Sequence, residues 1–142
     1  MSIPAHLNIV TIGVADLPRS VAFYTAIGWR RSSASMDGIS WFDVGACALG
    51  LFPRDELAAD AGVPDGPGGF GGITLAINLA SESEVDAALA DAERAGGTIV
   101  KPAQRAEWGG YSGYFADPDG TCWEVAMNPG FALRDDGSLV LP

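Results

Sequence analysis

The chain is poor in several residue types, and each shortage excludes a class of protein. Only eight of its 142 residues are Lys or Arg, against 18 Asp or Glu, so its formal net charge is −10. That charge repels nucleic acid and anionic membranes, and we exclude both as main partners. With one histidine and two cysteines, the chain also has too few donors for a zinc knuckle or ribbon.

Long apolar runs are missing as well. A membrane-spanning helix needs about 18 or more consecutive apolar residues, and Gly, Asp and Arg interrupt every such run here. The N-terminus has no basic segment followed by an apolar one, which argues against a signal peptide and for a cytoplasmic location. Cys47 and Cys122 lie in apolar, strand-like contexts, and we interpret both as buried free thiols.

What is present describes a compact globular protein. Nearly half of the residues are apolar and few are charged, which is not the composition of a disordered chain. The length suits a single domain over 1–142 or two small repeats that share a sheet.

The same order of elements occurs twice along the chain. The first half predicts a strand, a helix between the N-cap Asp16 and Gly28, and three strands: 9–14, then 29–33, 39–44 and 47–52, with a helical turn over 55–61. The second half predicts a strand, a helix that Ser81 and Glu84 cap, and three more strands: 73–79, then 98–100, 111–116 and 121–127. We therefore expect an α+β fold with module one at 5–61, a Gly/Pro-rich linker at 62–72, module two at 73–129 and a tail at 130–142.

The stretch GYFADPDGTCWEVAMN (113–128) is the most informative part of the sequence. Asp117-Pro118-Asp119-Gly120 is typical of a turn, because proline presets φ, aspartate bonds nearby backbone and glycine accepts positive φ. The hairpin that results places Glu124 inside an otherwise apolar strand. It resembles the last two strands of the glyoxalase/bleomycin-resistance/extradiol-dioxygenase group, the vicinal oxygen chelate superfamily. The segments VTIGVADLPRSVAFYTAIGW and GGITLAINLASESEVDAALADAERAGG resemble the openings of its two modules.

The resemblance implies two βαβββ modules whose incurved mixed sheet forms a cleft, and a homodimer. It also implies a metal site, in which the glutamate of the final strand is usually a ligand. The family's other ligand positions correspond to Ile9 and Thr74, which are poor donors, and 47–52 offers no carboxylate or imidazole. One carboxylate cannot hold a divalent ion against water, so we expect no cofactor or metal. His6 is the other candidate metal ligand, but its odd offset from Ile9 points it to the opposite strand face.

Strand alternation suggests what fills the cleft instead. Cys122, Glu124 and Ala126 share one face of their strand, as Thr74, Ala76 and Asn78 do of theirs. Small groups leave room, and apolar walls with a few polar anchors suit a small organic molecule. The candidate ligand-binding residues are Glu124, Asn78, Thr74, Trp41, Phe52, Trp108, Tyr111 and Tyr114. The alternative for each ring is packing in the core or a dimer interface, and Arg54 is either a counter-charge at the rim or a solvated loop residue.

Glu124 is the only catalytic candidate, and three roles remain open for it: a binding carboxylate, a general base with a raised pKa, or a buried structural acceptor. The sequence favours metal-independent binding of a small organic molecule, comparable to bleomycin-resistance sequestration. The alternative is a metal-dependent lyase or isomerase of the lactoylglutathione lyase type. Whether the protein is an enzyme stays open at this point.

Overall fold

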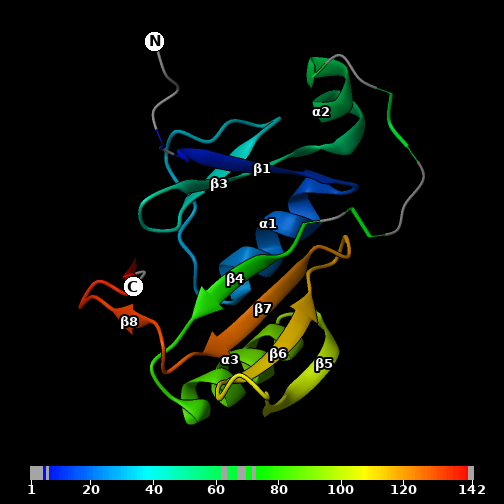
Figure 1. Cartoon of the computed structure of the whole chain (residues 1–142). Coiled ribbons are helices and arrows are strands. Elements are labelled where there is room, and N and C mark those ends of the chain that lie inside the picture. Colours follow the sequence, from blue (N-terminus) through cyan, green and yellow to red (C-terminus); the bar gives the residue numbers. More distant parts are fainter. Residues whose placement is uncertain (1–4, 6, 62–63, 67–69, 72, 141–142) are drawn as a thin grey trace. The chain divides into compact units, whose positions relative to one another are not determined.

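The computed structural model describes residues 5, 7–61, 64–66, 70–71 and 73–140. The chain divides into two compact units, 1–66 and 67–142, and the division falls inside the predicted linker. Figure 1 shows the course of the chain and labels most of its helices and strands. Each unit combines helices with a small mixed sheet, so the expected α+β class is confirmed.

Unit one is built from β1 (Ile9–Val14), α1 (Leu17–Ala26), β2 (Ser40–Asp43), β3 (Ala48–Pro53) and α2 (Arg54–Ala61). Its sheet has the order β1-β3-β2, with β1 parallel and β2 antiparallel to β3. The Asp16 side chain accepts a hydrogen bond from Arg19 N at 3.1 Å and so begins α1 as predicted. The core of the unit consists of Val14, Phe23, Tyr24, Phe42, Leu49 and Leu51.

The strand predicted over 29–33 does not form. Only an isolated bridge joins Arg31 to Phe42. The Trp29 ring instead stacks on Tyr24, with 5.4 Å between the ring centroids. The Ser32 hydroxyl accepts a hydrogen bond from Ala34 N at 3.1 Å. Such local side-chain bonds compete with a strand ladder, and here they turn the chain.

Unit two follows the predicted βαβββ order: β4 (Leu75–Asn78), α3 (Glu82–Arg94), β5 (Thr98–Arg105), β6 (Tyr111–Ala116) and β7 (Cys122–Met127). The sheet order is β4-β7-β6-β5, with β4 parallel to β7 and the other pairs antiparallel. Helix α3 covers one face of this sheet (Figure 1). The core of the unit consists of Val85, Leu89, Ala92, Phe115, Trp123 and Val125.

The N-terminal end of α3 is capped as the sequence predicts. Ser81 Oγ accepts from Glu84 N at 3.2 Å, and Glu84 Oε2 accepts from Ala80 N at 2.9 Å. The tail contains a short hairpin of β8 (Ala132–Leu133) and β9 (Leu139–Val140) that the sequence did not predict. No helix within the described residues is long and apolar enough to span a membrane.

Candidate functional site

The register of the unit-two sheet assigns Glu124 to the face opposite α3. Trp123 pairs with Leu75 and Phe115, and these side chains belong to the face that α3 covers. Glu124, one residue on, pairs with Ala76 of β4 and Tyr114 of β6. Because strand side chains alternate, Cys122, Glu124 and Ala126 share the face opposite α3, as predicted.

The turn between β6 and β7 sets this register. Asp117 is buried, and its Oδ1 accepts hydrogen bonds from Asp119 N at 2.9 Å and Thr121 N at 2.8 Å. Gly120 has a φ of 85°, a conformation that glycine adopts without strain. The turn predicted at these four residues is therefore confirmed, and it holds Tyr114 directly opposite Glu124.

Tyr114 and Glu124 form a polar pair on this face. Both side chains are half-buried. Burial raises the pKa of the Tyr114 phenol above its usual value of 10.0, and the nearby Glu124 carboxylate raises it further by its charge and by a hydrogen bond with the phenol. The phenol therefore stays protonated at neutral pH and can donate to the carboxylate.

The rest of the face opposite α3 consists mostly of small side chains, of which Ser112 and Ala126 are buried. Ala76, Ala126 and Ser112 surround the pair in the sheet, and Asn78 pairs with Ala126 at the end of β4. Asn78 is half-buried, whereas Thr74 is exposed and precedes β4 by one residue. The structure thus brings Glu124, Tyr114 and Asn78 to one sheet face.

Two of the predicted rings do not join Glu124. The Tyr111 hydroxyl donates to Asp86 Oδ1 on α3 at 2.7 Å, so Tyr111 lies on the helix-covered face. That hydrogen bond is the main cause that raises the Tyr111 pKa. Trp108 lies in the loop before β6, about half exposed, with its ring over Gly110, where a Cβ would collide with it.

The other two rings belong to unit one. Trp41 pairs with Gly50, and Phe52 pairs with Gly13. Phe42, the residue after Trp41 in β2, packs against Tyr24 of α1. Because side chains alternate along a strand, Trp41 lies on the face of the β1-β3-β2 sheet away from α1, and the register places Phe52 on that same face. Both are half-buried.

Arg54 begins α2, and it does not stand free at a rim. Its Nε donates to Asp65 Oδ1 at 2.7 Å, and both side chains are substantially exposed. The stem of Arg54 lies against Gly13, where an added Cβ would be 3.1–3.2 Å from its atoms. This arrangement describes a solvated ion pair on the surface of unit one.

The donors do not fit the metal site that the family resemblance implies. Among the described residues, no group of three or more His, Cys, Asp or Glu side chains could hold a metal ion. Ile9 and Thr74 offer no imidazole or carboxylate, and Cys47 and Cys122 are free thiols, each half-buried. His6 lies outside the described residues, so its role stays a prediction.

Sequence reasoning missed one polar contact, between Asp86 and Tyr111. These residues are 25 positions apart, and no local pattern connects a helix aspartate to a tyrosine at a strand start.

Comparison with known proteins agrees with this fold. The model of the Glyoxalase/Bleomycin resistance protein/Dioxygenase superfamily matches residues 6–125. A glyoxalase-related enzyme from Fulvimarina pelagi is 32% identical over 97% of this chain and 99% of its own, with a TM-score of 0.87. A glyoxalase/bleomycin resistance protein/dioxygenase from Nocardioides is 28% identical over 92% of this chain and 87% of its own, with a TM-score of 0.73.

A more distant structure carries an enzyme name. Lactoylglutathione lyase from Agrobacterium tumefaciens is 24% identical over 89% of this chain and 96% of its own, with a TM-score of 0.66. At that identity the likeness shows the fold alone. No curated protein matches the sequence.

Proposed function

Because this chain belongs to the Glyoxalase/Bleomycin resistance protein/Dioxygenase superfamily, we propose that it binds a small organic molecule at Glu124, on the face of the unit-two sheet opposite α3, without a metal. One observation carries the proposal. The glutamate that the family resemblance marks as a metal ligand lies directly opposite Tyr114 in the sheet, and among the described residues no group of partner donors completes an ion site. Glu124 occupies the position of the family's glutamate in the final strand, and the side chain opposite it is the Tyr114 phenol.

The Glu124–Tyr114 pair offers a ligand two kinds of polar contact. A carboxylate has about four acceptor sites, and one bond from a phenol leaves most of them open. A ligand with an amine, amide or hydroxyl donor can therefore bind Glu124, while the Tyr114 oxygen can accept a further hydrogen bond. Ala76, which pairs with Glu124, is small and exposed, so an apolar body can lie beside the pair. We assign Asn78 to a third polar contact at the end of β4.

The alternative in the superfamily is a metal-dependent lyase or isomerase. Its chemistry needs a Lewis acid that stabilises negative charge on the reacting oxygens. The described residues supply Glu124 and no set of partner ligands that could hold such an ion beside it. Ser112 lies in β6 between Tyr111 and Gly113 and has no histidine beside it among the described residues, so it is not a candidate nucleophile.

Calorimetric titration in the presence of a chelator tests the proposal. The probes are a bleomycin-type glycopeptide, aromatic amines and thiol conjugates, titrated into the wild type, Glu124→Gln and Tyr114→Phe. We expect at least one probe to bind the wild type and to bind Glu124→Gln about tenfold or more weakly, since hydrogen bonds to a charged group contribute about 1.5–3 kcal/mol. Asp60→Asn, which removes an exposed charge from α2 of unit one, is the matched control. Equal affinity for wild type and Glu124→Gln would contradict the proposed role of Glu124.

A further inference from the structure

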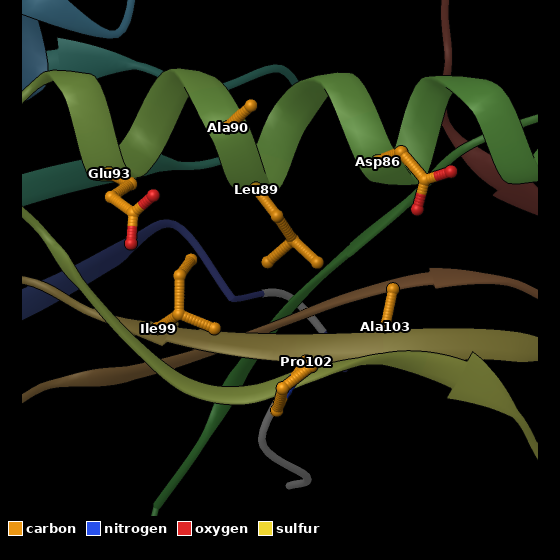
Figure 2. Close-up of a pocket in the computed structure, with 7 residues that line it drawn as sticks. All are labelled: Asp86, Leu89, Ala90, Glu93, Ile99, Pro102 and Ala103. Carbon is orange, nitrogen blue, oxygen red and sulfur yellow. The ribbon is translucent and has the colours of Figure 1, made fainter.

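A groove lies on the other side of the unit-two sheet, between α3 and β5, away from Glu124. It has a volume of about 290 Å³ and is lined by Asp86, Leu89, Ala90, Glu93, Ile99, Pro102 and Ala103. Figure 2 shows the carboxylates of Asp86 and Glu93 at its two ends, with Leu89 between them and Ile99, Pro102 and Ala103 on the facing strand.

The groove follows from the irregular course of β5. This edge strand pairs only with β6, and its register shifts between Ile99 and Lys101 and again between Lys101 and Gln104. Such bulges bend a strand locally. Pro102, which lacks an N–H donor, lies within the second shift, between Lys101 and Gln104, where the regular ladder is already lost. Space therefore remains between this part of β5 and the helix.

The floor of the groove is apolar. Leu89 is only 6% exposed, and Ile99 and Ala103 are half-buried. Leu89 sits low because β6 carries Gly113 beneath it, where a Cβ would lie 2.7 Å from Leu89 Cδ1. A ligand in this groove therefore contacts a strip of hydrocarbon between the two acidic ends.

The two carboxylates have a defined spacing and no basic neighbour in the lining. Asp86 and Glu93 are seven positions apart on α3, close to two turns, so they lie on one side of the helix about 10 Å apart. The Tyr111 hydroxyl bonds Asp86 Oδ1 and holds that carboxylate in place. Glu93 is exposed. The two negative charges are separated by about the length of an extended heptyl chain, and the floor between them is apolar. The groove is therefore complementary to a dication whose two charges are joined by a hydrocarbon chain.

We propose that this groove binds linear aliphatic diamines whose ammonium groups are about 10 Å apart, one on Asp86 and the other on Glu93. The methylene chain lies along Leu89, Ile99 and Ala103. The acidic charge of the whole chain, −10, raises the local concentration of such dications. This site does not depend on the proposed ligand of Glu124.

The test is a titration of the labelled protein followed by amide and methyl NMR, with three probes: diaminoheptane, the shorter diaminopropane, and heptylamine. We expect diaminoheptane to shift the signals of Leu89, Ile99 and Ala103 and to bind more tightly than either other probe. Asp86→Asn and Glu93→Gln should each weaken its binding about twofold to fivefold, because exposed ion pairs are weak. Asn keeps an oxygen that can accept from Tyr111, so the first variant preserves that contact.

Three outcomes would overturn the proposal. Heptylamine could bind as tightly as diaminoheptane, which would show that only one charge is recognised. The control variant Asp60→Asn could weaken binding as much as Glu93→Gln, which would show attraction to an acidic protein in general. Diaminoheptane could also leave the groove signals unchanged at millimolar concentration.

Discussion

At the scale of single residues, the account depends on which atoms face Glu124. Strand alternation alone predicts the face of Glu124, since the residues on either side of it, Trp123 and Val125, are large and apolar. Strand alternation does not predict which residue lies opposite Glu124, because that depends on the number of residues in the turn and on the register of the paired strands. For this reason Tyr114 was predicted only as one of several candidate rings, and Tyr111 was not separated from it.

The titration of the tyrosines tests the pairing. Because Glu124 raises the Tyr114 pKa by charge and by hydrogen bonding, Glu124→Gln should lower that pKa and leave the Tyr111 pKa unchanged. Asp86→Asn should do the reverse, since Asp86 acts on Tyr111. NMR of ring-labelled tyrosine resolves the three phenols of the chain. A Tyr114 pKa that does not respond to Glu124→Gln would show that the two side chains are not paired.

The raised pKa values of Tyr111 and Tyr114 determine whether alkaline pH increases or decreases the stability of the fold. Both phenols have a folded-state pKa above the unfolded value of about 10. Their protonated forms are therefore favoured in the folded state, and the associated stability is complete below about pH 10. It is lost as the pH rises through the folded-state pKa values. We expect the urea midpoint to fall less steeply above pH 10 in Tyr114→Phe than in the wild type.

At the scale of elements, the sequence predicts those strands and helices whose signals are local. Residues 9–14 and 111–116 were predicted with the bounds that the structure has, because alternation and clear turn residues enclose them. The strand β5 was predicted only as far as residue 100, since Lys101, Pro102, Gln104 and Arg105 break the alternation. It continues to Arg105 because β6 offers an unpaired edge. The strand predicted at residues 29–33 does not form, because the local hydrogen bond to the Ser32 hydroxyl turns the chain there and outweighs pairing with a neighbouring strand.

The turn at Asp117 provides a stability test at this scale. Asp117→Ala removes the acceptor of two backbone N–H groups in a buried position. Hydrogen bonds to a charged group contribute about 1.5–3 kcal/mol, and the variant should lose about that much free energy of unfolding in urea denaturation. Asp117→Asn keeps one acceptor oxygen and should lose less. Equal losses in the two variants would show that the side-chain oxygen is not what holds the turn.

At the scale of the whole molecule, an acidic surface accompanies a number of exposed apolar side chains. Ile9, Phe70, Ile73 and Val100 are each at least half exposed. Where exposed apolar side chains gather into one contiguous patch, the patch often marks an interface. The sequence could suggest association by family analogy, but it could not identify the surface, since exposure depends on the folded chain.

We propose that the protein is a homodimer, and light scattering at micromolar concentration measures this. The expected mass is twice 14.7 kDa, and substituting Asp for Ile73 or Val100 should shift the equilibrium toward the monomer if either lies in the interface. Asp for the exposed Ala87 of α3 is the control for added charge. A monomeric mass across that concentration range would contradict the proposal.

The central claim is that Glu124 serves a ligand and not a metal ion, and elemental analysis of protein purified without chelator tests it most directly. The account predicts no stoichiometric Zn, Ni, Mn or Fe, because the described residues offer no set of partners for the Glu124 carboxylate. The wild type and Glu124→Ala should therefore give the same background metal content. About one equivalent of metal per chain in the wild type, lost in Glu124→Ala, would contradict the account and would make His6 the first residue to substitute next.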